Sequence, residues 1–260
     1  DVCSSDLFDN VIIEVGNEMD EVSTDFQYHF IRFIKNYEQR KPKQHPVGMT
    51  AVGPRSKDVF NSPGEWISPP RLGGWCDKDD LYFKDPPIPV TGHVSMIDND
   101  HICPMWTWSS KEKRNWVWKS FTRGHNPIHM DRYNSINGTP KQDHPIPGVA
   151  TQELEDPLRQ AMGDTRRFAR KLDLVHATPS IDPAHCSTRF CLRNPGKEVI
   201  VYQPSGSGGI TIDLAPGTYT VETFDTKDGS RATSTIDNWG GGSRAISRPS
   251  HTAEDWVCYV

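Results

Sequence analysis

The sequence lacks any apolar run approaching the roughly 20 residues that a membrane-spanning helix requires. It also lacks an excess of positive charge, since its formal net charge is -5 at pH 7. Proteins that bind nucleic acid cluster Lys and Arg against the phosphates. We therefore expect neither a membrane span nor a nucleic-acid partner.

Cysteine is scarce as well, with 6 residues in a chain of 260, and none of them forms a Cys-x-x-Cys pair. The cysteine spacing therefore gives no indication of a zinc site. Cys186 and Cys191 are close enough in sequence to bridge across a tight turn, but five cysteines remain when Cys3 is set aside, and this odd number predicts mostly free, buried thiols. We predict no metal site, and place four histidines in the core or beside a site instead: His93, His101, His125 and His129.

The first seven residues, DVCSSDL, match the translation of a common sequencing-library adapter. We therefore expect residues 1–7 to be non-native and not part of the fold. On that reading we expect the natural protein to begin further upstream. The signal of a secreted or periplasmic protein would then precede this sequence.

The stretch NVIIEVGNE, residues 10–18, predicts a strand buried on both faces, because its apolar run is continuous. Polar residues gather where this strand ends, at Asn17 and Glu18. In barrels of alternating strands and helices, catalytic groups lie at the C-terminal ends of the strands. Glu18 is therefore a candidate catalytic carboxylate, and Asn17 could orient a substrate hydroxyl or the acid itself.

Strands and helices alternate through the first two thirds of the chain, which predicts an α/β fold with a parallel sheet. Further strands are predicted at 45–52, 65–68, 94–98 and 126–131, and helices at 23–40, 115–123 and 156–174. In the first helix, four aromatic residues at helical spacing are expected to face the core. They are Phe26, Phe30, Phe33 and Tyr37. Pro157 is placed in the first turn of the last helix.

The pattern changes near residue 180. Alternating apolar segments such as KEVIVYQP and TYTVETFD, separated by Gly and Pro turns, predict an antiparallel β-sandwich. We therefore divide the chain into a barrel-type domain at 8–183 and a C-terminal sandwich at 184–260.

Three segments carry a family resemblance. The polar cluster Asp98-Asn99-Asp100-His101 stands where one family has roughly Asp-Thr-Asp-His, and WVWKSFTRGHNPIHMD and NPGKEVIVYQPSG follow it. With the GNE at Glu18, these segments resemble bacterial clan A glycoside hydrolases that carry a C-terminal β-sandwich of the collagen-binding type. The resemblance covers nearly all of residues 8–260. It implies an eight-stranded TIM barrel in which Glu18 ends the fourth strand and Asp98 the seventh.

The resemblance implies hydrolysis of a polysaccharide or oligosaccharide by two carboxyl groups, with no cofactor. Glu18 would be the acid/base, and its partner would be Asp98 or Asp100. Alternation along the strand puts both aspartates on one side, so the sequence does not choose between them. The clan implies retention of configuration, although an Asp nucleophile departs from the Glu that is usual there.

Further residues are assigned to the substrate-binding wall, partly because aromatic faces stack on sugar rings. They are Asn17, Trp66, His93, His101, Trp106, Arg123 and Asp131. A competing interpretation is a non-catalytic carbohydrate- or matrix-binding protein on a degenerate barrel. Because only five barrel strands are predicted, we also expect an open, incomplete barrel and an inactive 260-residue chain.

Overall fold

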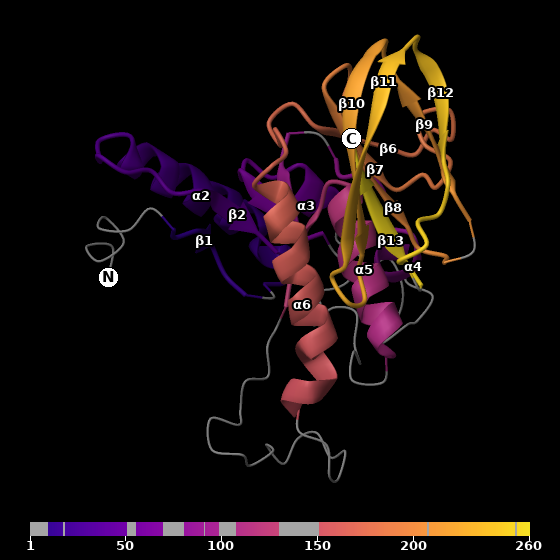
Figure 1. The fold of residues 1–260 in the computed structure, drawn as a ribbon. Helices are drawn as coiled ribbons and strands as arrows, with labels where there is room; N and C mark the ends of the chain where they lie inside the picture. The colour runs from indigo at the N-terminus through magenta and orange to yellow at the C-terminus, as the bar shows by residue number, and fades with distance from the viewer. Residues whose placement is uncertain are drawn as a thin grey trace.

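The computed structural model describes residues 10–17, 19–50, 56–69, 81–90, 92–98, 108–129, 151–206, 208–252 and 254–260. Figure 1 shows an N-terminal α/β region, two central helices and a C-terminal β region. None of the described helices is long and apolar enough to cross a membrane.

The N-terminal region is built on five parallel strands that pair in chain order. They are β1 (Ile13–Glu14), β2 (Val47–Met49), β3 (Trp66–Ile67), β4 (Val94–Asp98) and β5 (Asn126–Ile128). All five lie within the segments predicted as strands, so the parallel sheet is confirmed. Within the described residues the sheet ends at β1 on one side and at β5 on the other.

Among the described residues, five α-helices and one 3-10 helix accompany the sheet. They are η1 (Glu21–Ser23), α2 (Thr24–Glu38), α3 (Ser56–Phe60), α4 (Leu81–Lys84), α5 (Ser110–Thr122) and α6 (Thr151–Ala169). α5 begins five residues earlier than predicted, because Ser109 and Glu112 form a reciprocal capping box. α6 also begins earlier, so Pro157 lies inside the helix and not in its first turn.

The aromatic face of α2 points away from the core, contrary to the sequence prediction. Phe26 and Phe33 are 53% and 56% exposed, and Phe30 stacks between them. The buried face instead carries Ile31, which packs on β2 together with Val59 of α3. The spacing of the aromatics was read correctly as helical, but a regular stripe does not identify which face meets the sheet.

The two faces of the parallel sheet have different surroundings. Val47, Met49 and Ile67 point to the outer face, where they pack against α2 and α3. The register puts Glu14, Gly48, Trp66 and Val94 together in one row on the opposite, inner face, because side chains alternate along each strand. Val94 on this inner face is 54% exposed.

The C-terminal region is an antiparallel sandwich, as predicted. A six-stranded sheet has the order β11-β10-β13-β8-β7-β6, and β9 pairs with β12 in a second sheet. The strands are β6 (Thr178–Ser180), β7 (Cys191–Asn194), β8 (Glu198–Gln203), β9 (Ile210–Leu214), β10 (Gly217–Asp225), β11 (Arg231–Trp239), β12 (Gly242–Ile246) and β13 (Trp256–Tyr259). β6, β11 and β12 were not predicted individually.

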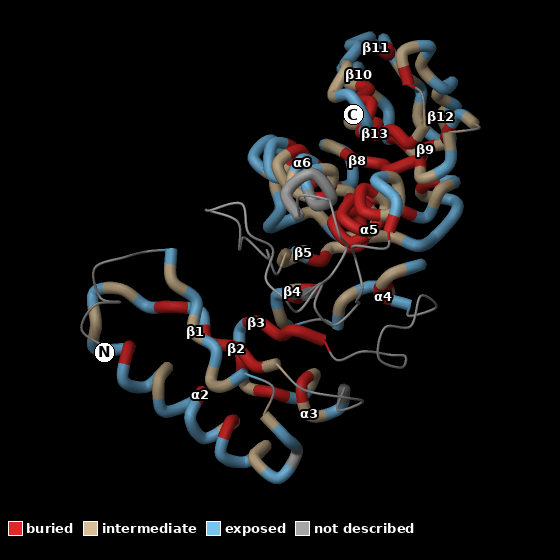
Figure 2. The backbone as a smooth tube through the Cα atoms, turned by 90° about the horizontal axis from the view of Figure 1, so that it is seen from below, coloured by how far each residue is buried: buried red, intermediate tan, exposed pale blue. Residues whose placement is uncertain are grey.

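Strand β8, near the centre of the six-stranded sheet, is buried on both faces. Val199 and Val201 of β8 face the two-stranded sheet, whereas Ile200 and Tyr202 face α5 and α6. Trp118 of α5 stacks on Tyr202 with ring centroids 6.0 Å apart. In Figures 1 and 2, α5 and α6 lie between the sandwich and the parallel sheet. The sandwich therefore shares one hydrophobic core with the helices of the barrel region.

Candidate active site

The C-terminal edge of the parallel sheet is where a barrel enzyme carries its catalytic groups. Asn17 follows β1 at this edge and is exposed. Asp98 is the last residue of β4 and its backbone pairs with Ile128, but its side chain lies outside the described part of the structure. The same holds for the whole of five other predicted site residues: Glu18, Asp100, His101, Trp106 and Asp131.

Trp66 lies on the inner face of the sheet, within β3. Its indole ring covers Gly48 on β2, and a Cβ atom at position 48 would overlap that ring. Trp66 is only 5% exposed, and its Nε1 has no hydrogen-bond partner among the described residues. The ring thus forms part of the inner wall, one layer below the strand ends.

Glu14 is an inner-face carboxylate that the sequence analysis did not single out. It is exposed and accepts a hydrogen bond from the Thr50 hydroxyl, which follows β2. The signal was present in the sequence, since Glu14 is a charged residue inside an otherwise apolar strand segment.

His93 is placed at the other end of β4 from Asp98. It precedes the strand, and its Nε2 lies 3.0 Å from the carbonyl oxygen of Ser62. Five residues of strand at about 3.3 Å each separate the two ends. The structure therefore does not bring His93 to the edge that carries Asp98.

Arg123 closes α5 and ties three segments together. Its guanidinium donates to Asp85 at 2.6 Å, to the carbonyl of Pro86 at 2.7 Å and to the carbonyl of Arg189 at 2.8 Å. It also lies 4.5 Å from the ring centroid of Phe190. These contacts join the segment after α4 to the turn that precedes β7, so Arg123 has an architectural position.

His125, the residue before β5, is buried and neutral. Its Nδ1 lies 2.7 Å from the Ser95 hydroxyl and its Nε2 2.7 Å from the carbonyl of Pro87. Burial, which disfavours the charged ring, lowers the pKa of His125 to about 4. This histidine therefore holds the start of β4 and β5 together.

Comparison with known proteins supports a fold and not a specific relative. No protein-family model and no curated protein matches the sequence. Among the similar solved structures, two share 13% sequence identity with this chain. One is a glycoside hydrolase (TM-score 0.64), matched over 98% of this chain and 65% of that one. The other is a glycoside hydrolase family 5 protein from Bacteroides vulgatus (TM-score 0.63), with shares of 96% and 62%.

The fold is that of barrel glycoside hydrolases. The family resemblance read from the sequence is thus confirmed for the fold, including the β-rich region that follows the barrel part. This chain spans slightly less than two thirds of the length of either structure.

A cavity of about 560 Å³ lies at the opposite end of this glycoside hydrolase fold. It is lined by residues at the starts of β4 and β5, including Val94 and Asn126, and by Pro179 of β6. The N-terminal face of a barrel typically serves stability, and catalysis occupies the C-terminal face. We therefore do not take this cavity as the catalytic site.

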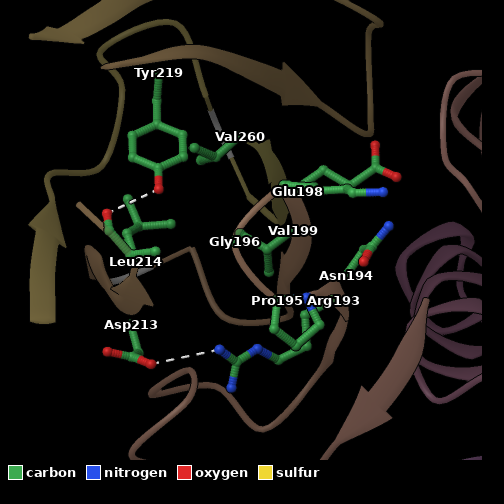
Figure 3. A pocket seen from close by; sticks show the side chains of 12 residues that line it. Arg193, Asn194, Pro195, Gly196, Glu198, Val199, Asp213, Leu214, Tyr219 and Val260 are labelled. Carbon is green, nitrogen blue, oxygen red and sulfur yellow. Dashed lines mark hydrogen bonds and ion pairs between the residues drawn. The ribbon is translucent and has the colours of Figure 1, made fainter. Parts of the chain in front are cut away.

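The sandwich offers a much smaller pocket, shown in Figure 3. It lies around the β7–β8 turn, next to the ion pair of Arg193 and Asp213 at 3.4 Å, and measures about 20 Å³. That volume holds about one water molecule and no sugar ring. Of the two sandwich tryptophans, Trp256 is fully buried and Trp239 faces the guanidinium of Arg244 at 5.0 Å.

Proposed function

We propose that the whole protein hydrolyses glycosidic bonds of a polysaccharide or oligosaccharide, with Glu18 as acid/base and Asp98 or Asp100 as its partner. One observation carries the proposal. The parallel register brings the C-terminal ends of β1 and β4 to a single edge of a sheet that has the glycoside hydrolase fold.

Strand spacing favours this pairing if the sheet is curved. β1 and β4 are three strands apart, or about 14 Å along a flat sheet at 4.8 Å per strand. Paired glycosidase carboxyls lie about 5–9.5 Å apart. Barrel curvature turns inner-face side chains toward the axis and shortens that separation.

The proposed mechanism retains configuration in two steps. Glu18 protonates the leaving glycosidic oxygen while the aspartate attacks the anomeric carbon, which forms a glycosyl ester. Glu18, now a carboxylate, then removes a proton from water as the water displaces the aspartate. Asn17, Trp66, His101, Trp106 and Asp131 are proposed to line the sugar site. His93 and Arg123 are not assigned to the sugar site. His93 lies at the other end of β4, and Arg123 joins the segment after α4 to the turn before β7.

The division of labour is also part of the proposal. Residues 8–183 would contribute to catalysis, and residues 184–260 would form an accessory sandwich. A secreted or periplasmic location fits a polymeric carbohydrate substrate, because such polymers are encountered outside the cytoplasm.

The test uses the complete reading frame that encodes this chain, assayed on a panel of aryl glycosides and glycans. We expect Glu18→Gln to lower kcat/KM at least about 10³-fold on unactivated glycans, because the leaving oxygen loses its proton donor. Glu14→Gln on the same strand is the matched control, with an expected loss below tenfold. Asp98→Asn and Asp100→Asn identify the nucleophile. Near wild-type turnover of Glu18→Gln would refute the assignment.

A further inference from the structure

We propose that two copies of this chain associate through the aromatic row of α2, with the two helices antiparallel. The row consists of Phe26, Phe30, Phe33 and Tyr37, which are between 37% and 56% exposed. Phe30 stacks on Phe26 with ring centroids 5.6 Å apart and on Phe33 with centroids 5.9 Å apart. In Figure 2, α2 lies at the end of the parallel sheet that is away from the sandwich. This inference does not depend on the glycosidase proposal.

The spacing of the aromatic row is that of a seam between two helices. Its members follow one another at intervals of 4, 3 and 4 residues. This 3.5-residue repeat is how a helix presents one strip of side chains to another helix. The strip that faces the parallel sheet has the same spacing one residue later, at Gln27, Ile31, Ile34 and Glu38. α2 therefore carries two packing strips, and the sheet covers one of them.

One flank of α2 already has a helical neighbour. The hydroxyl of Thr24 donates to Asp58 Oδ2 of α3 at 3.0 Å, and the hydroxyl of Tyr28 donates to the Asp58 carbonyl. At about 100° per residue, the aromatic row lies on the opposite flank of the helix. Within the described part of the chain this flank stays exposed, and exposed apolar strips of this kind mark interaction sites. A second helix fits there.

The aromatic row is complementary to itself when two such helices run antiparallel. A two-fold axis between residues 31 and 32 sets Phe26 of one copy opposite Tyr37 of the other. The same axis sets Phe30 opposite Phe33. Aromatic side chains thus meet aromatic side chains at each level of the seam. Because a two-fold pair uses the whole row on both copies, association stops at a dimer.

Charge favours a second copy of this helix as the occupant. Acidic residues gather at the start of α2 and basic residues at its end. They are Asp20, Glu21 and Asp25, and Arg40, Lys41 and Lys43, respectively. In the antiparallel pair, the acidic start of each helix lies beside the basic end of the other, and the helix dipoles also oppose each other. A parallel pair would bring like charges together.

The size of the row sets the strength of this dimer. A Phe or Tyr side chain can bury about 150–250 Å², so four half-exposed rings on each of two copies bury roughly 800 Å² in total. Interfaces below about 1,200 Å² belong to transient complexes. We therefore expect monomer and dimer to exchange at micromolar concentrations.

Sedimentation equilibrium of the 260-residue chain, from micromolar to submillimolar concentration, tests the dimer. The variants leave the aromatic row intact and change two exposed residues beside it, His29 and Asn36. The antiparallel pair brings residue 29 of one copy within one helical turn of residue 36 of the other. His29→Glu with Asn36→Lys then places opposite charges across the seam twice. His29→Glu with Asn36→Glu, and His29→Lys with Asn36→Lys, place like charges there.

We expect the variant with opposite charges to dimerise about tenfold more tightly than either like-charged variant at low salt, and high salt should narrow the difference. The two like-charged variants differ from it in net charge in opposite directions, so net charge cannot produce this order. Equal dimerisation of the three variants would overturn the antiparallel pair. A wild-type chain that stays monomeric at every concentration would overturn the proposal without any variant, and would leave the row to a helix of another polypeptide segment.

Discussion

The parallel sheet and the six-stranded sheet differ in how their faces are covered. Parallel strands β1 to β5 contain two to five residues, and within the described part of the chain helices pack on their outer face. The inner face presents Glu14 and Val94 to solvent. In contrast, β8 has six residues and is buried from both sides. Buried side chains are thus concentrated around α5, α6 and the sandwich. The candidate catalytic edge belongs to the parallel sheet, whose inner face is less covered.

The largest expected effect comes from removing a large side chain from the core that α5, α6 and the sandwich share. Trp118→Ala removes a fully buried ring that contacts Phe168 at 5.7 Å and Tyr202 at 6.0 Å. We expect the free energy of unfolding to fall by about 3–5 kcal/mol, measured by urea denaturation. Phe33→Ala on the exposed face of α2 is the control, with a change within about 0.5 kcal/mol. Equal effects would mean that the core is not shared.

A second test concerns a buried charged residue that links the sandwich to α5. Asp255 is fully buried and accepts hydrogen bonds from Arg114 at 3.0 Å and from Tyr202 at 2.9 Å, which links the sandwich to α5. Asp255→Ala leaves the Arg114 guanidinium without its most buried partner. We expect a loss of about 3–5 kcal/mol in the free energy of unfolding.

The matched variant is Arg114→Met combined with Asp255→Ala, which removes both charges. Its loss in the same urea titration should be smaller than the sum of the two single losses, because no buried charge is stranded. Strict additivity would contradict a coupled pair.

A third test measures how stability depends on pH through His125, the residue before β5. The folded-state pKa of His125 is about 4, below the ordinary 6.5, so the folded chain binds fewer protons between these values. The contribution of His125 to the free energy of unfolding is therefore complete above pH 6.5. As the pH falls from 6.5 toward 4, the free energy of unfolding decreases by up to about 3 kcal/mol. Melting curves from pH 7 to pH 4 measure it.

The control for this titration is His125→Gln, which can keep both hydrogen bonds without titrating. The difference in stability between wild type and variant should change across pH 6.5–4 and be flat above it. A constant difference over the whole range would rule out His125 as the titrating group.

The smallest expected change in stability concerns the exposed aromatics of α2. Phe26→Glu with Phe33→Glu should alter the free energy of unfolding by less than about 1 kcal/mol, because both rings face solvent. Exposed apolar patches promote association, so the variant should sediment with less self-association than wild type. Asn36→Glu with Gln39→Glu adds the same charge outside the aromatic row. An equal effect of that control pair would assign the change to charge alone.

The sequence allowed much of the fold to be predicted, for identifiable reasons. β2 to β5 were recognised because each lies in a short apolar segment, and those of β4 and β5 also end in polar residues. β8 was recognised because its apolar segment lies between Gly and Pro turns. β11 was missed because most of its side chains are exposed, so it lacks an apolar pattern. The start of α5 was readable from Ser109 and Glu112 but was overlooked.

The candidate site was only partly predictable. Asn17 and the backbone of Asp98 lie at the expected edge, whereas His93 and Arg123 were grouped with them by residue type alone. His93 precedes its strand, so its position in the sequence already places it at the N-terminal end of β4. Glu18, Asp100 and the side chain of Asp98 lie outside the described residues, and their catalytic roles stay predictions.

The burial of both faces of β8 has a consequence for how such proteins can be recombined. A segment that begins at β6 carries Ile200, Tyr202 and Phe224 on a face complementary to Trp118 and Phe168. If this segment were grafted onto an unrelated barrel, its apolar face would meet helices whose surface is not complementary to it. We therefore expect a chimera, natural or engineered, to fold when its crossover point precedes α5. The helices α5 and α6 then come from the same parent protein as the sandwich.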